Sequence, residues 1–446
     1  MSSPMRRLRQ AAAVALAAVT ALGATVACGE DKTPSGAKPD KLIVDTFGEF
    51  GYEDLVKQYE TQNNIKIELR KTGDLGDYRN KLVRYLATGR GAGDVVALEE
   101  GIINEFKLNQ ANWVDLAQYA PSGKSGEYLQ WKWDLGKTAD GKVIGYPTDV
   151  GSLGACYRRD LFQAAGMPFE RDAVSASWTT WDQFIAVGQQ YKAKTGKGFV
   201  DSLASVSNAV LFQQPPGDLF YDKDDNLYDP SVKPADRKPT DLIAAKSPAV
   251  KAAWDTAVKI HNAGIEAKTA TWTNEWSAGF KQGTFAVTMC PSWMLGIVKG
   301  NSGDANAGKW DLAAVPGGSG NWGGSWLGVP AQSKYPAEAA KLADFLTNAT
   351  SQVAAFKKSG PLPTNTTALA SADFTSYTNP YFNNAPTAKV FGDAVKNIQP
   401  VHLGPKHGAV KERAFESALN ALMAGQLSAD AAWEKFLNDV PSQGAF

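Results

Sequence analysis

The first part of the chain alternates short apolar runs with longer amphipathic stretches. Strand-like runs occur at 41–45, 65–70 and 94–98, whereas 52–62 and 77–88 repeat apolar residues at helical spacing. This strand, helix, strand, helix, strand order predicts a mostly parallel sheet covered by helices. In such sheets ligands bind at the loops beyond the carboxyl ends of the strands.

Acidic side chains follow the predicted strands at these positions. Glu49 and Phe50 lie in the loop after the first strand, and Glu99 and Glu100 follow the third. Asp149 comes two residues after 142–147, the first segment that reads as a crossing between two lobes. These side chains are therefore candidates for one cleft.

The rest of the chain contains two further turn-like crossings, at 315–316 and 360–363. Helical patterns are found at 336–350, 388–397 and 410–423, and 220–229 reads as a hairpin with a polar tip. These crossings predict two discontinuous lobes, an N-terminal lobe of 41–147 plus 316–359 and a C-terminal lobe of 148–315 plus 360–446.

Tryptophan is unusually frequent, with 13 residues, and several lie near the predicted crossings. The segment 284–330 places three of them beside glycine turns, where a core strand would normally carry Val, Ile or Leu. Any one of these indoles could simply be a core residue. As a group, however, they indicate a surface on which the apolar face of a sugar ring can stack; the group is Trp272, Trp276, Trp293, Trp322 and Trp326.

The overall charge does not favour a highly charged partner. The 446 residues include 46 basic and 46 acidic side chains, so we expect no nucleic-acid partner. The length is sufficient for two or more domains of roughly 150 residues each. A neutral or locally recognised ligand is expected.

The N-terminus resembles the secretion signal of a bacterial lipoprotein. A basic head (5–9) precedes an apolar run (11–24) and small residues that end at Cys28. We predict a signal peptide over 1–27, acylation of Cys28 and a flexible tether over 28–40, which would anchor the protein to the outer face of the cell membrane. An unmodified, exposed Cys28 is the alternative.

The two remaining cysteines, Cys156 and Cys290, each lie in a strand-like run. Outside the cytosol a pair of thiols tends to oxidise, so we predict a Cys156–Cys290 disulfide. Two separate buried thiols are the alternative, because the sequence does not establish that the two strands are neighbours.

Motifs for metal and cofactor chemistry are weak. His402 and His407 lie five positions apart across a Gly-Pro pair, a spacing that does not match a zinc motif, and the acidic run 222–226 is not followed by the glycine of a calcium loop. The glycine-rich stretch 89–94 follows a helix and precedes a strand, the reverse of a phosphate-binding order. We expect no metal and no cofactor.

Paired carboxylates leave one enzymatic hypothesis open. Glu49, Glu99, Glu100 and Asp149 could supply the acid and base of a secreted glycoside hydrolase. The same groups could instead accept hydrogen bonds from sugar hydroxyls without chemistry. A purely structural surface lipoprotein is a third possibility.

Several segments resemble the extracellular solute-binding proteins of carbohydrate ABC importers, the group that includes maltose-binding protein. The matching segments, in order, are KLIVDTF, GDVVALEEGIINEFKLNQANWVDL, YPTDVGSLGACYRRDLF, FKQGTFAVTMCPSWM, WGGSWLGVPAQSKYPAEAAKLADFL and SGPLPTN. The resemblance implies a type II periplasmic-binding-protein fold with two α/β lobes, each a mostly parallel sheet flanked by helices, and a sugar bound between them. It also implies a monomer that closes on its ligand and delivers it to membrane permeases whose ATPase is a separate chain.

The resemblance also assigns candidate ligand contacts. Trp293 matches a ring-stacking position, and Trp322 and Trp326 lie in the glycine-rich segment where pocket contacts are common. Acceptors of sugar hydrogen bonds are implied at Glu49, at Glu99 or Glu100, and at Asp149, with weaker matches at Gln213 and Arg413. The clustered tryptophans favour a di- or oligosaccharide.

Overall fold

The computed structural model describes residues 38–213 and 217–445. The predicted signal peptide, the predicted lipidation site Cys28 and most of the predicted tether lie outside these residues, so those expectations stay predictions. Helices in the described part of the chain are too short or too polar to cross a bilayer.

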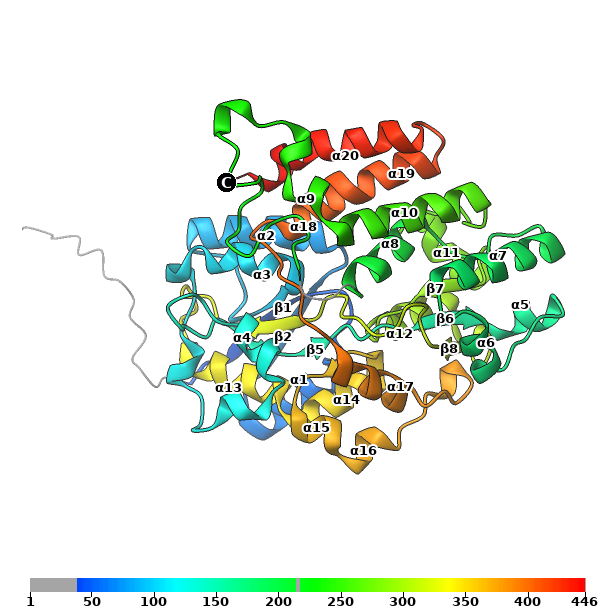
Figure 1. The fold of residues 1–446 in the computed structure, drawn as a ribbon. Helices are drawn as coiled ribbons and strands as arrows, with labels where there is room; N and C mark the ends of the chain where they lie inside the picture. The colour runs from blue at the N-terminus through cyan, green and yellow to red at the C-terminus, as the bar shows by residue number, and fades with distance from the viewer. Residues whose placement is uncertain (1–37, 214–216, 446) are drawn as a thin grey trace, which may run out of the picture. The chain divides into compact units, whose positions relative to one another are not determined.

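The largest sheet contains five strands in the order β2 (Lys66–Thr72), β1 (Lys41–Phe47), β3 (Val95–Glu99), β9 (Ser325–Gly328) and β4 (Tyr146–Pro147) (Figure 1). The three predicted strands of the first part of the chain are thus confirmed. β1 runs parallel to β2 and β3, whereas β9 runs antiparallel to β3 and β4. A strand from late in the chain therefore completes a sheet begun at the N-terminus.

Helices cover both faces of this sheet, namely α1 (Glu53–Asn63), α2 (Leu75–Thr88), α3 (Glu100–Lys107), α4 (Gln130–Leu135) and α13 (Pro336–Thr347). Val95 and Ala97 of β3 belong to the core that includes α1 and α13, while Val96 and Leu98 belong to the core that includes α2 and α3. Figure 1 shows these two helix pairs on opposite sides of the strands. Because both faces are covered, β3 is a continuous apolar run without polar alternation.

The second sheet has three strands in the order β7 (Val287–Met289), β6 (Ala155–Arg158) and β8 (Trp310–Ala313). Both pairings of β6 are antiparallel, so the expectation of a mostly parallel sheet in each lobe is wrong for this sheet. β7 and β8 run in the same direction and are joined through a helix. The gap between them is filled by β6, a strand from more than a hundred residues earlier that runs the opposite way.

The remaining elements surround the second sheet and the connection between the sheets. The helices are α5 (Arg159–Ala164), α6 (Arg171–Ser177), α7 (Trp181–Thr195), α8 (Leu203–Phe212), α9 (Ile243–Lys246), α10 (Pro248–Ala263), α11 (Asn274–Gln282), α12 (Met294–Ser302), α14 (Ala349–Ser359), α15 (Thr366–Ala370), α16 (Ala372–Thr375), α17 (Thr387–Ala394), α18 (His407–Val410), α19 (Ser417–Met423) and α20 (Ala429–Gly444). A π-helical turn, Lys411–Glu416, joins α18 to α19. The predicted helices at 388–397 and 410–423 correspond to α17 and to this α18–α19 run.

The predicted hairpin at 220–229 is wrong, because the segment contains no strand. Instead, the carboxylate of Asp222 accepts hydrogen bonds from the backbone N–H groups of Asp224 and Asn226, at 3.0 and 2.8 Å. The side chain therefore stabilises its own loop, a local alternative to strand pairing that Asp and Asn commonly adopt.

The chain leaves the five-stranded sheet directly after β4. Two residues later β5 (Asp149–Val150) pairs antiparallel with β10 (Leu362–Pro363), which lies in the last segment expected to cross between lobes. The backbone N–H of Thr148 donates to Ser325 of β9, and that of Gly151 donates to Gly323. The connection thus consists of chain segments that hydrogen-bond to one another.

Cys156 of β6 and Cys290, directly after β7, form a disulfide, as predicted. Both residues are fully buried, and their strands are neighbours in the second sheet. The bridge lies three residues before Trp293 and stiffens the strand end that leads to it.

Candidate functional site

Four tryptophans form a continuous row, which we call the indole row: Trp276, Trp272, Trp293 and Trp322. The ring centroids of successive members lie 5.0, 6.2 and 5.8 Å apart. Trp322 also stacks on Phe212 at the end of α8, with centroids 6.5 Å apart and planes 17° apart. Trp272 is 55% exposed, Trp293 and Trp322 are half-buried, and Trp276 is buried. Three of the five predicted indoles therefore present surface that a ligand can reach.

Trp293 is held by the turn that follows the disulfide. Ser292 donates its hydroxyl to the carbonyl of Val150 at 2.8 Å and its backbone N–H to Ser152 at 2.9 Å. The indole N–H of Trp293 donates to the carbonyl of Trp322 at 2.8 Å. Because the N–H is satisfied by backbone, the ring keeps its orientation without using a side-chain partner.

The glycines around Trp322 allow its backbone to approach the crossing segment. A Cβ on Gly151 would lie only 1.8 Å from the carbonyl oxygen of Trp322, so no other residue fits there without a shift. The N–H of Trp322 donates to the carbonyl of Gly151 at 2.8 Å. The indole row is thus joined directly to the connection between the two sheets.

Glu99 lies beside this row, at the end of β3. Its Oε2 accepts a hydrogen bond from the N–H of Gly101 at 2.6 Å and caps α3. A Cβ on Gly323 would lie 3.2 Å from Oε1 of Glu99 and 3.8 Å from Nε1 of Trp293, which brings the carboxyl and the indole to the same glycine. A residue of the first sheet and one that follows the second sheet therefore meet here.

Although Glu99 keeps partial solvent contact, burial raises the pKa of its carboxyl to about 8. Lys411 opposes this shift, and the nearby Glu100 and Glu412 add to it. At neutral pH the group is therefore mostly protonated, so it can donate a hydrogen bond as well as accept one.

A buried charge cluster lies behind Glu99. Nζ of Lys132 is 2.5 Å from Oε2 of Glu100, and Asn321 donates to Oε1 of the same carboxylate at 2.8 Å. Asp149 is also buried, which raises the pKa of its carboxyl, while Lys132 lowers it. The hydroxyl of Thr148 donates to Asp149 at 2.6 Å. Both carboxyl groups are therefore already engaged by internal partners.

The sequence matches the family model of bacterial extracellular solute-binding proteins over residues 54–382. The chain belongs to this family. A crystal structure of an extracellular solute-binding protein of family 1 shares 36% identity and a TM-score of 0.75, and the match covers 91% of this chain and 100% of that one.

Two further matches have lower identity. An ABC-transporter-associated binding protein of B. animalis subsp. lactis, solved in complex with β-1,6-galactobiose, is 19% identical at a TM-score of 0.74 over 91% of this chain and 98% of that one, which establishes the shared fold. A lactose-binding protein of Rhizobium radiobacter is 28% identical over 36% of this chain, and that stretch spans only 33% of its length. The fold is the two-lobed α/β fold of type II periplasmic binding proteins, as predicted.

In this solute-binding protein two predicted stacking residues are not accessible. Trp276 is 2% exposed and donates its indole N–H to the carboxylate of Asp201 at 2.8 Å. Trp326 is fully buried, donates to the carbonyl of Lys132 at 3.0 Å, and lies under the Lys132 ammonium group, 4.0 Å from its ring centroid. Trp276 supports the indole row, whereas Trp326 supports the charge cluster.

The other predicted contact residues are engaged by neighbours of their own or lie at the surface. Glu49 is exposed and ion-paired to Lys71 at 2.7 Å, and Phe50 is 7% exposed, with its ring 5.2 Å from that of Phe47. Gln213 donates its side-chain amide to the carbonyl of Pro316 at 2.7 Å. Arg413 is exposed on the π-helical turn.

Three charged residues near the site were not identified from the sequence: Lys132, Lys411 and Glu412. Lys411 and Glu412 lie on the π-helical turn and influence the pKa of Glu99. Turns of this type are rare and often occur at functional sites. The sequence pattern of 410–423 is that of an ordinary amphipathic helix, so nothing in it marks the extra residue per turn.

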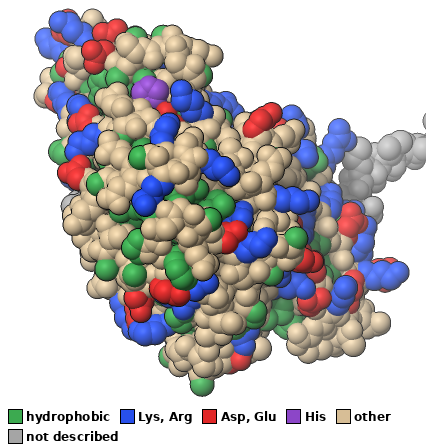
Figure 2. Space-filling view, turned by 90° about the vertical axis from the view of Figure 1, so that its right-hand side faces the viewer, with side chains coloured by type: hydrophobic (Ala, Val, Ile, Leu, Met, Phe, Trp, Pro, Cys, Tyr) green, Lys and Arg blue, Asp and Glu red, His purple; other side chains and the backbone are tan. Residues whose placement is uncertain are grey.

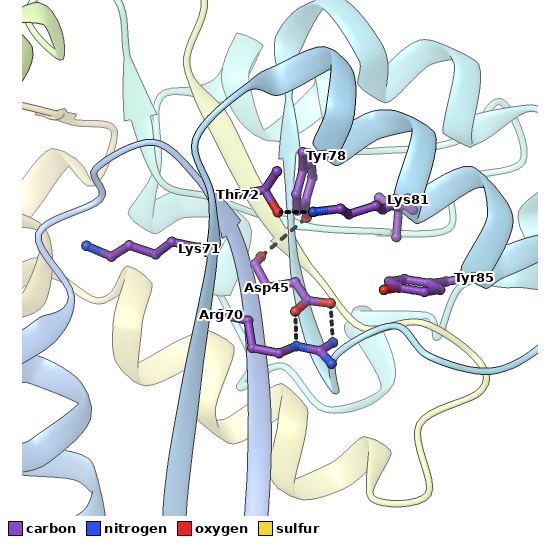
Figure 3. Close-up of a pocket in the computed structure, with 8 residues that line it drawn as sticks. Asp45, Arg70, Lys71, Thr72, Tyr78, Lys81 and Tyr85 are labelled. Carbon is purple, nitrogen blue, oxygen red and sulfur yellow. Dashed lines mark hydrogen bonds and ion pairs between the residues drawn. The ribbon is translucent and has the colours of Figure 1, made fainter.

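A separate cavity lies between α2 and the edge of the five-stranded sheet and is lined by Asp45, Arg70, Lys71, Thr72, Tyr78, Lys81, Leu82 and Tyr85 (Figure 3). Arg70 and Asp45 point toward one another and form a bidentate ion pair at 2.6 and 2.7 Å, while Lys71 points away from them. Because its central charges neutralise each other, this cavity is a weaker candidate than the indole row. Figure 2 likewise shows basic and acidic side chains intermixed over the visible face.

The raised pKa of Glu99 leads to a testable dependence of stability on pH. The ordinary pKa of a glutamate carboxyl is 4.5, and in the folded protein the pKa of Glu99 is about 8. The free energy of unfolding that Glu99 contributes is therefore fully present below pH 4.5 and is lost as the pH rises through about 8, because the buried carboxyl must then ionise. We expect Glu99→Gln to raise the melting temperature relative to the native protein at pH 8 to 9 and to flatten its decline from pH 5 upward.

Thermal unfolding at a series of pH values measures this effect. Glu49→Gln, which changes an exposed carboxylate in the loop after β1, is the matched control. Its plot of melting temperature against pH should run nearly parallel to that of the native protein. If the Glu99→Gln profile were also parallel, the carboxyl would not be protonated in the folded state.

Proposed function

We propose that this protein is the extracytoplasmic carbohydrate-binding component of an ABC importer and that it binds a di- or oligosaccharide at the indole row. The observation that carries the proposal is the row itself, with Trp272, Trp293 and Trp322 accessible beside Glu99. Relatives whose names record lactose and arabinooligosaccharide binding support the same class of ligand.

The chemistry of the row suits a sugar. Burial of about 50 to 100 Å² of apolar pyranose surface on an indole contributes roughly 1 to 3 kcal/mol per contact. Such contacts supply affinity, and polar groups at the rim supply orientation. The protonated carboxyl of Glu99 can donate to one sugar oxygen and accept from another hydroxyl.

We further propose the lobe boundaries given by the sequence, 41–147 plus 316–359 and 148–315 plus 360–446. The composition of the sheets supports this division, since β1, β2, β3, β4 and β9 come from the first set of residues and β6, β7 and β8 from the second. Glu99 would then belong to one lobe and Trp293 to the other. A ligand that contacts both residues favours the closed arrangement, because only closure provides both contacts.

The proposal includes partners and location. The closed protein would deliver its ligand to membrane permeases whose ATPase is a separate chain, and acylation at Cys28 would tether the monomer to the outer face of the cell membrane. Glu99, Glu100 and Asp149 would act in binding or in structure and not as a catalytic pair. Internal partners at Glu100 and Asp149 support this interpretation over the glycoside hydrolase.

Thermal shift against mono- and oligosaccharides, followed by analysis of the recovered sugar, tests the function. We expect at least one oligosaccharide to raise the melting temperature and to be recovered intact. Recovery of hydrolysed sugar would favour the hydrolase. If no sugar stabilised the protein, the carbohydrate proposal would be wrong.

A further inference from the structure

The helix α3 has two sides with different surroundings. Ile102 and Phe106 are buried in the core that α3 shares with α2, in the proposed N-terminal lobe. Gly101, Asn104 and Lys107 recur at a spacing of three, so they lie on successive turns on the other side of the helix. This second side faces residues from much later in the chain.

The first two of these residues contact the segment that leads into α18. A Cβ on Gly408 would lie 3.1 Å from the carbonyl oxygen of Gly101, so the two backbones are almost in contact. The side-chain amide of Asn104 donates a hydrogen bond to the carbonyl of Leu403. Figure 1 shows α18 beside α3. Under the proposed lobe boundaries, both contacts join one lobe to the other.

The third residue, Lys107, is influenced by a carboxylate of the same opposite lobe. Burial lowers the pKa of Lys107 to about 8, and the negative charge of Asp225 opposes this shift. The ammonium group also donates to the carbonyl of Leu135 at 2.8 Å. An electrostatic attraction to Asp225 therefore adds to the two direct contacts of α3.

The residues opposite α3 are connected to one another. Nε2 of His402 lies 2.9 Å from the carboxylate of Asp225. A Cβ on Gly404 would lie only 2.2 Å from the ring of Tyr221, and Leu403 is buried in the core that surrounds the second sheet. The loop that carries Asp225 and the segment before α18 are therefore held together, so α3 faces a preformed surface.

We propose that residues 101, 104 and 107 of α3, together with 225, 403 and 408, form a lobe latch that sets how long the closed protein retains a bound sugar. This rests on the proposed function and on the proposed lobe boundaries. None of these residues belongs to the indole row or to a crossing segment. The latch stabilises the closed form through contacts between the lobes and not through contacts with the sugar.

This arrangement affects release more than recognition. A sugar enclosed between two lobes leaves only after they open, so each contact that must break before opening slows dissociation. Because the latch contacts do not involve the ligand, they slow the release of every bound sugar by the same factor. The preference among sugars stays a property of the residues that touch them.

Gly408→Ala tests the latch with a minimal change. Alanine favours a helix more than glycine does, so α18 itself should not be weakened. The added methyl group, however, pushes against the carbonyl of Gly101 when the lobes close. We expect sugar dissociation to become about tenfold faster, while the melting temperature of the sugar-free protein stays equal or rises.

Stopped-flow tryptophan fluorescence measures the dissociation rates. The ligands are those oligosaccharides of the thermal-shift panel that bind, from a panel that includes maltose, lactose and β-1,6-galactobiose. Asn104→Ala, which removes the hydrogen bond to Leu403 without adding bulk, is the second variant and should speed dissociation about fivefold. If sugar-free Gly408→Ala melted at a lower temperature, Asn104→Ala would decide the outcome.

Two control variants match these substitutions. Gly300→Ala adds a methyl group to α12, where a Cβ would have no neighbour within 4 Å, and Asn80→Ala removes an exposed amide from α2. Both should leave the dissociation rates unchanged.

Native dissociation rates in both Gly408→Ala and Asn104→Ala would overturn the latch and leave the carbohydrate proposal standing. Faster release of one sugar alone would make these residues sugar contacts and would also overturn the latch. Failure of the native protein to bind any oligosaccharide of the panel would overturn both proposals.

Discussion

Trp293→Ala is expected to weaken sugar binding by about 100-fold, close to 3 kcal/mol, while the protein remains folded. The indole supplies stacking surface to the ligand, and its N–H ties the turn after the disulfide to Trp322. The substitution also removes the ring against which Trp272 and Trp322 pack. Titration calorimetry with the sugar that gives the largest thermal shift measures the effect.

Trp433→Ala is the matched control for this experiment. Trp433 is also half-buried, but it lies on α20 and packs against Trp254 and Phe436. Its loss should lower thermal stability and leave sugar affinity nearly unchanged. If Trp293→Ala bound sugar as tightly as the native protein, the indole row would not be the binding site.

Lys132→Met is expected to reduce the free energy of unfolding by about 3 to 5 kcal/mol, because it leaves buried carboxyl groups without their cation. Nζ of Lys132 is fully buried against Glu100, and its removal also takes away the contact over the Trp326 ring. Urea unfolding of the native protein and the variant measures the difference.

Two variants make this experiment selective. Lys137→Met breaks an ion pair with Asp134 at the surface and should cost less than about 1 kcal/mol. The double substitution Lys132→Met with Glu100→Gln removes the buried anion as well and should recover part of the lost stability. Equal effects of Lys132→Met and Lys137→Met would mean that the buried pair contributes no more than a surface pair.

The secondary structure of the first part of the chain could be predicted because its pattern is local. Apolar residues at 55, 56 and 59 and at 78, 82 and 86 lie on one side of a helix at any position in a fold, and these residues are buried in α1 and α2. The disulfide was predictable from the compartment and from the strand-like runs around two cysteines. The antiparallel second sheet was not, because strand direction depends on which distant segment fills the gap between β7 and β8.

Only part of the candidate site could be predicted from the sequence. Trp293 and Trp326 occur in similar sequence surroundings, PSWML and GSWLG, yet Trp293 is half-buried and Trp326 is fully buried. Burial depends on which helices and loops cover each ring, and composition does not record that. Glu99 and Glu100 are adjacent in the chain, but only Glu100 faces Lys132.

The sequence by itself determined the family and the apolar periodicities of the main helices and strands. It also determined which tryptophans and acidic residues lie near the predicted crossings between the lobes. These properties follow from residue type and spacing, which are local. Only the tertiary structure decided which indoles remain accessible, how Lys132 pairs with Glu100, and that the pKa of Glu99 is raised to about 8. Those outcomes depend on burial and on contacts between residues that are far apart in the chain, because desolvation and pairing act through space.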